Sequence, residues 1–76
     1  MQGMGALYKQ HGITIRVNGN EHAPVHAHVL FGDGNALVYL NGKTLNRGVP
    51  PAALKTAQAW IAEHADEIKT EWERWN

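Results

Sequence analysis

The first half of the chain alternates apolar and polar residues with a period of two. Ile13, Ile15 and Val17 are separated by Thr14 and Arg16, an alternation typical of a β-strand with one buried face. Similar stretches follow after short polar or glycine-containing breaks. The pattern predicts four strands, over residues 13–18, 26–31, 36–40 and 43–47.

Two dipeptides predict the turns between these strands. Asp33-Gly34 and Asn41-Gly42 are typical two-residue hairpin loops, because a type I′ turn needs positive φ at both central residues. The first loop would pair His28 with Tyr39, and the second would pair Tyr39 with Thr44. This register collects an apolar face of Ala27, Val29, Phe31, Ala36, Val38, Leu40 and Leu45. It collects a mixed face of His26, His28, Leu30, Leu37, Tyr39, Thr44 and Asn46.

The last third of the chain changes to a helical period. Pro50-Pro51 suits a helix start, and neither Gly nor Pro occurs between residues 52 and 75. Apolar residues there recur every three or four positions. The sequence therefore predicts an α+β fold, a four-stranded antiparallel β-meander with one long C-terminal helix packed on its apolar face. It leaves open whether that helix breaks near residues 64–66, where Asp66 is a candidate cap.

Size and composition indicate a small globular protein. The chain has 76 residues, of which 43% are apolar and 18% charged, and it has no cysteine. We expect a single domain over residues 1–76, with a frayed start over 1–5. A secreted domain of this size usually carries disulfides, so the cytoplasm is the expected compartment. No apolar run approaches the roughly 18 residues of a membrane span, so no membrane contact is expected.

The charges are unevenly distributed although the net charge is zero with His neutral. Residues 1–55 carry five Lys or Arg against two Asp or Glu, and residues 56–76 carry two against five. The pattern predicts a mildly basic sheet and an acidic helix. A zero net charge also argues against direct nucleic-acid binding.

The densest candidate chemistry is the H-x3-H-x-H run of His22, His26 and His28. Two residues apart on a strand, His26 and His28 point the same way, as zinc ligands can, and His22 is a candidate third ligand. Three protein ligands would indicate an open, catalytic type of zinc site. The nearby carboxylates are Glu21 and Asp33.

Two other hypotheses compete for the same histidines. His26 and His28 could act as acid and base of a ribonuclease, with Tyr39 beside them and Arg16 or Lys43 holding phosphate, although zero net charge disfavours this. Alternatively, the rings donate to backbone carbonyls of the preceding loop and pack on Tyr39 across the strands. The sequence favours this structural role, and we expect no catalytic residue, no metal and no cofactor.

The C-terminal helix offers a second candidate surface. Trp75 lies near the chain end beside Glu71 and Arg74, and Trp and Arg are frequent anchors of protein interfaces. An acidic helix face that includes Glu67 could compete with nucleic acid for a basic partner. The candidate partner-binding residues are therefore His22, His26, His28, Tyr39, Glu67, Glu71, Arg74 and Trp75.

These motifs together resemble the domain of unknown function 4160 family. The resemblance covers residues 12–75, and the residues that carry it are Ile13, Ile15, His22, Pro24, His26, His28, Phe31, Gly32, Gly48, Pro50, Trp60, Ile68 and Trp72. Two positions depart from the family pattern. Val25 stands where the family tends to have a second Pro, and Ala27 where it tends to have an aromatic residue.

The resemblance implies a small bacterial protein without a settled activity. Members often lie beside another short reading frame, as in toxin–antitoxin modules, and related small domains on phages and mobile elements include anti-CRISPR inhibitors. The resemblance thus favours a non-enzymatic inhibitor or regulator that binds a protein or nucleoprotein complex, such as a CRISPR effector. The alternative is a toxin–antitoxin component, with a histidine-dependent ribonuclease as its toxin form.

Overall fold

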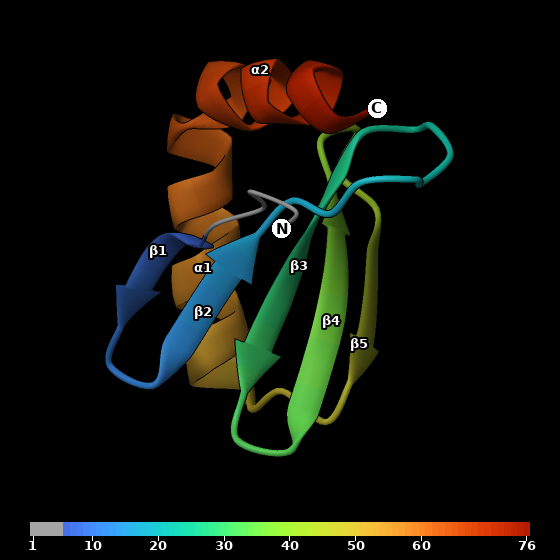
Figure 1. Cartoon of the computed structure of the whole chain (residues 1–76). Coiled ribbons are helices and arrows are strands. Elements are labelled where there is room, and N and C mark those ends of the chain that lie inside the picture. Colours follow the sequence, from blue (N-terminus) through green and yellow to red (C-terminus); the bar gives the residue numbers. More distant parts are fainter. Residues whose placement is uncertain (1–5) are drawn as a thin grey trace.

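The computed structural model describes residues 6–76 as one antiparallel sheet and two helices (Figure 1). The elements in chain order are β1 (Ala6–Gln10), β2 (Ile13–Arg16), β3 (His26–Phe31), β4 (Gly34–Tyr39), β5 (Thr44–Arg47), α1 (Pro51–Glu63) and α2 (Ala65–Trp75). The strands neighbour one another in sequence order. The α+β class is confirmed, but the sheet has five strands rather than four, and the helical region forms two helices rather than one. The frayed start expected over residues 1–5 lies outside the described residues.

The additional strand β1 pairs with β2 through a tight turn. His11 and Gly12 form this turn with φ values of 55° and 77°, which suits a type I′ hairpin. A histidine at positive φ is uncommon, so the pair gives a weaker turn signal than Asn-Gly. The pairing of β1 with β2 shifts register between Ala6 and Tyr8. Apolar and polar residues therefore do not alternate regularly along β1, and the sequence gives no strand signal there.

The β3–β4 hairpin turns at Gly32-Asp33, two residues earlier in register than the predicted Asp33-Gly34 loop. His26 therefore faces Tyr39, and His28 faces Leu37 instead of the predicted Tyr39. A shift of two residues keeps every side chain of this hairpin on its predicted face. The two predicted faces of β3 and β4 are accordingly retained.

The β4–β5 connection is one residue longer than predicted, and this change moves β5 to the opposite register. The Tyr39 N–H donates to the Lys43 carbonyl at 2.8 Å, which leaves residues 40–42 as a three-residue loop with Gly42 at φ 100°. Because the shift is odd, Leu45 now pairs with Leu37 on the face away from the helices. Thr44 points to the helix side, where its Oγ1 accepts a hydrogen bond from Gln58.

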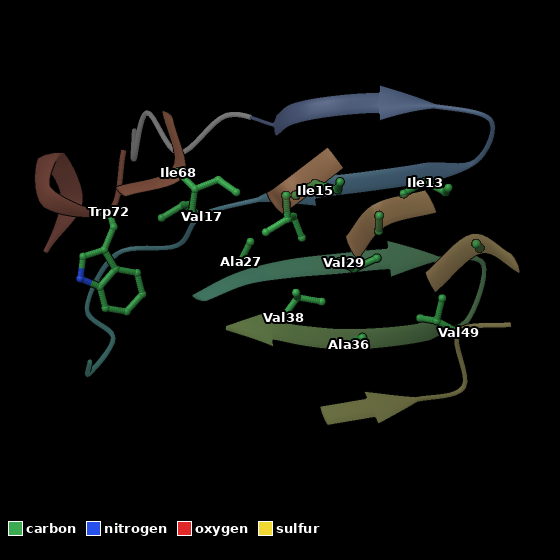
Figure 2. Packing of buried hydrophobic residues seen from close by; sticks show 13 residues of the cluster. Ile13, Ile15, Val17, Ala27, Val29, Ala36, Val38, Val49, Ile68 and Trp72 are labelled. Atoms are coloured by element: carbon green, nitrogen blue, oxygen red, sulfur yellow. The ribbon is translucent and has the colours of Figure 1, made fainter. Parts of the chain in front are cut away.

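Among residues 6–76, the buried apolar core lies on one side of the sheet (Figure 2). Apolar residues of β2, β3 and β4 meet α1, while Ile68 and Trp72 of α2 cover the end of the sheet near Val17 and Ala27. The buried core comprises Ile13, Ile15, Val17, Ala27, Val29, Ala36, Val38, Val49, Ala53, Ala57, Ile61, Ile68 and Trp72. The other side of the sheet carries no helix in the part of the chain that the structure describes (Figure 1).

The helical region breaks at His64, within the range 64–66 where the sequence left a break open. The His64 ring stacks on Trp60 with centroids 4.0 Å apart, and its Nδ1–H donates to the Trp60 carbonyl. Asp66 lies in the first turn of α2 and does not cap it; no side-chain bond caps α2 at its start. The break lets α2 turn across the end of the sheet (Figure 1). Among the described residues, neither helix is long and apolar enough to span a membrane.

Candidate functional site

Glu21, His26 and His28 form a compact group at the start of β3. Glu21 Oε1 lies 2.8 Å from His26 Nε2 and 2.8 Å from His28 Nε2, and Glu21 Oε2 lies 3.0 Å from His28 Nε2. One ligand-type atom from each residue lies within 4.8 Å of the other two. We refer to these three residues as the Glu-His-His cluster.

Local strand geometry accounts for the histidine pair. His26 and His28 occupy alternate positions of β3 and point to the same side of the sheet, with ring centroids 5.4 Å apart. The His26 ring also contacts the rings of Tyr39 and Trp72, at centroid distances of 4.8 and 4.9 Å. We predicted both histidines on the face away from the core. His28 is half-buried there, but His26 is only 6% exposed because Trp72 of α2 encloses it.

Contacts distant in sequence hold Glu21 in position. The Glu21 N–H donates to Asn76 Oδ1 at 2.7 Å. The Asn76 amide in turn donates to the Asn18 carbonyl at 3.0 Å and to the Trp72 carbonyl at 3.2 Å. The end of α2 therefore fastens the loop between β2 and β3.

His22 does not join this group. Its side chain is exposed, and the three-residue set that could hold a metal ion contains Glu21 in its place. Of the candidate ligands His22, His26 and His28, the structure brings His26 and His28 together, with Glu21 in place of His22. Glu21 was visible in the sequence as a nearby carboxylate, but the local pattern gives no sign that Glu21 turns inward and His22 outward.

A second candidate surface is the face of the sheet away from the helices, which we call the open face. Two rows of residues cross it from β2 to β5, Thr14–Leu30–Asn35–Arg47 and Arg16–His28–Leu37–Leu45. Leu30 and Leu45 are 36% and 42% exposed. Basic side chains border these leucines, and the Lys43 ammonium lies 5.9 Å from the centre of the Tyr39 ring.

The position of Leu45 on the open face was not predicted from the sequence. Leu45 was assigned to the apolar face that meets the helix, because Asn41-Gly42 reads as a two-residue loop. The length of the β4–β5 loop determines which face of the sheet Leu45 joins. No residue within 40–42 indicates that this loop has three residues instead of two. Leu30 was correctly placed on the mixed face.

The residues of the predicted binding surface on α2 partly contact one another. Trp75 Nε1–H donates to Glu71 Oε2 at 2.7 Å, and Arg74 Nη1 lies 3.8 Å from Glu71 Oε1. Trp75 is half-buried, whereas Glu67 and Arg74 are exposed. The structure brings Glu71, Arg74 and Trp75 together as a second group. Their proposed contact with a partner stays a prediction.

Five antiparallel strands backed by two helices, with a histidine pair on the third strand, define a small α+β protein. The chain belongs to the family described as domain of unknown function (DUF4160), whose model matches residues 12–73. The matched region runs from the turn before β2 to the last turn of α2 and contains the entire Glu-His-His cluster. Neither a curated protein nor a solved structure gave a significant match.

Proposed function

We propose that this protein is a small non-enzymatic regulator that binds a protein or nucleoprotein complex through the open face of its sheet. The observation that carries this proposal is the exposure of Leu30 and Leu45 on a sheet face that no described helix covers. Sheets of this type bury one face and leave the other to solvent, where polar residues normally dominate. Exposed leucines in adjoining rows of that face favour contact with another molecule.

The basic residues around the two leucines indicate what kind of partner surface would fit the open face. Arg16 and Arg47 flank the leucines at opposite ends of the two rows, and Lys43 lies beside Tyr39 at the end of β4. A surface with apolar side chains bordered by Asp or Glu would complement this arrangement. We therefore propose an acidic protein surface as the docking partner, and a CRISPR effector complex is the specific candidate that the family resemblance brings forward.

Two features support binding over catalysis. His26 is enclosed by Tyr39 and Trp72, and a buried ring has little access to an RNA backbone. His28 Nε2 lies 2.8 Å from Glu21 Oε1, and this contact engages a nitrogen that a general acid or base would use. These contacts favour a structural or ligand-holding role for the pair over the ribonuclease alternative.

The binding proposal is tested with the purified chain and a partner captured from bacterial lysates with and without CRISPR machinery. The captured protein is purified and its affinity measured by calorimetry for the wild type and for the Leu30→Ser/Leu45→Ser double variant. We expect the double variant to bind about 10-fold more weakly, as the loss of about 1.4 kcal/mol of interface energy requires. Higher salt should also weaken binding, because the basic border contributes long-range attraction.

The matched control alters the other candidate surface. Glu67→Gln/Trp75→Ala changes α2 and leaves the open face intact, so its affinity should stay within about 2-fold of the wild type, below the hot-spot threshold. If this variant loses the partner while Leu30→Ser/Leu45→Ser retains it, the acidic helix is the binding surface and the open-face proposal is wrong. Growth inhibition that disappears in a His28→Gln variant would favour the ribonuclease alternative.

A further inference from the structure

We propose that the Glu-His-His cluster is a binding site for a divalent transition-metal ion of the zinc type. The site would have three protein ligands, His26 Nε2, His28 Nε2 and a Glu21 carboxylate oxygen, and one open coordination position. This inference goes beyond the proposed docking function: the two share His28, which lies in a row of the open face, but the metal site uses neither exposed leucine.

The protons of His26 give the first argument. His26 Nδ1 lies 2.9 Å from the Pro24 carbonyl oxygen, and a carbonyl only accepts, so Nδ1 carries a proton. The neutral ring then presents a bare lone pair at Nε2, which faces Glu21 Oε1 at 2.8 Å. Two lone pairs at this distance repel one another unless a cation lies between them, either a second proton or a metal ion.

The surroundings of His26 make that repulsion costly. Its side chain is 8% exposed, and the rings of Tyr39 and Trp72 pack against it. Water therefore screens the Glu21–His26 contact poorly, and an unpaired polar group in such a place is expensive. A bound metal ion would satisfy both lone pairs at once.

The supporting contacts match those around metal-binding histidines. Such residues usually donate their second ring N–H to a backbone carbonyl or a carboxylate, which fixes the tautomer and aims the ligating nitrogen. His26 has this contact with Pro24. Glu21 is held through its own backbone N–H by Asn76, so the carboxylate-bearing residue is also fixed in place.

The donor types and spacing suit zinc better than a hard cation. Two imidazoles and one carboxylate form a set that zinc enzymes use with a water in the fourth position, whereas calcium and magnesium prefer oxygen ligands. Donors around a tetrahedral zinc ion lie about 3.4 Å apart, given bonds of about 2.0–2.1 Å. The two donor distances from Glu21 Oε1 are 2.8 Å and would widen slightly through rotation of the Glu21 side chain, which is 25% exposed. All three donor atoms lie within 4.8 Å of one another.

Solvent reaches the cluster from the side of Glu21 and His28. Their side chains are 25% and 22% exposed, in contrast to His26. Within residues 6–76 the group contains three donors, so the fourth position would be taken by water or by a group from outside these residues. This arrangement corresponds to an open zinc site rather than a closed structural one.

The test uses chelator-treated full-length protein from which any histidine tag has been removed. Zinc titration followed by calorimetry should give one ion per chain, and zinc should raise the midpoint of thermal unfolding, because the metal binds the folded state. Cobalt should give the visible absorption of a tetrahedral site. Magnesium and calcium at the same concentration should leave the midpoint unchanged.

Three single variants locate the ligands. Glu21→Gln and His28→Gln should each lower zinc affinity by more than about 10-fold, and both positions are accessible enough for the fold to accept them. His22→Gln is the matched control, an exposed histidine next to the cluster, and should bind zinc as the wild type does. The proposal is wrong if zinc does not bind at one ion per chain, or if His22→Gln weakens binding as much as His28→Gln.

Discussion

Gly34 lies at the start of β4, where the chain passes very close to another backbone segment. A Cβ built on Gly34 would clash with the carbonyl group of Gly48 and would lie 2.9 Å from the Val49 nitrogen. Backbone atoms on both sides cannot move away as a flexible side chain can. Glycine at this position is therefore required by tertiary packing, and its own φ is not in the left-handed region.

We predict that Gly34→Ala lowers the free energy of unfolding by about 3 kcal/mol or more, in the range of severe core changes. Gly42→Ala is the control, since nothing lies within 4 Å of its Cβ position and only the φ of 100° is strained. That strain should cost about 1–2 kcal/mol. Urea denaturation of both variants measures the difference, and equal losses would show that the Gly34–Gly48 contact is unimportant.

The same glycine explains why the β3–β4 turn was predicted one residue too late, which shifts the strand register by two. The run Gly32-Asp33-Gly34 offers two possible two-residue loops, and only the distant contact with Gly48 determines which glycine turns and which is packed. The candidate site, too, could be predicted from local sequence only in part. The paired histidines follow from strand alternation, but the inward position of Glu21 depends on Asn76, which is 55 residues away.

At the scale of elements, α2 is a short helix with acidic side chains at both ends, and the helix dipole favours them at one end only. Asp66 and Glu67 lie in its first turn, where negative charge is favourable. Glu73 lies in its last turn, where negative charge is unfavourable. Both Asp66 and Glu73 are exposed and lie three or four residues from Lys69, so they form a matched pair at the two ends.

We predict opposite effects from neutralising these two side chains. Asp66→Asn should lower the free energy of unfolding by about 0.3–1 kcal/mol, and Glu73→Gln should raise it by a similar amount. Thermal unfolding at low salt measures both, and the difference should shrink in 1 M salt because screening shortens the range of the dipole interaction, to about 3 Å. Shifts of the same sign would indicate that net charge matters more than the helix dipole.

Sequence periodicity predicted the elements that have a clear apolar stripe or alternation and missed the one without. The strands β2 to β5 were expected and a break near residues 64–66 was left open, whereas β1, which has an irregular register opposite β2, was not predicted. The orientation of β5 could not be predicted, because a loop of three residues instead of two reverses its faces. Periodicity thus identifies a strand, and the loop before it determines which side of the strand is buried.

At the scale of the whole molecule, the fold depends on a single core on one side of the sheet. A chain of 76 residues has a total stability of only about 0.05–0.15 kcal/mol per residue. No disulfide supplements this core, because the chain lacks cysteine. Individual core residues should therefore matter far more than their neighbours on the open face.

We predict that Ile15→Ala lowers the free energy of unfolding by about 2–5 kcal/mol, since Ile15 is fully buried. Leu30→Ala is the control on the open face and should cost less than about 1 kcal/mol. Urea denaturation followed by tryptophan fluorescence and circular dichroism measures both. Comparable losses from the two variants would contradict a one-sided core.

The separation of the two faces also affects how such a protein can change over generations. Substitutions at Leu30 or Leu45 alter what the molecule presents to others while leaving Ile15, Val29 and Val38 untouched. Relatives can therefore diverge on this face at little cost to folding, as a docking surface for different partners would require. When sequences of the family are compared, we expect residue identity to vary more at open-face positions than at the core positions between them.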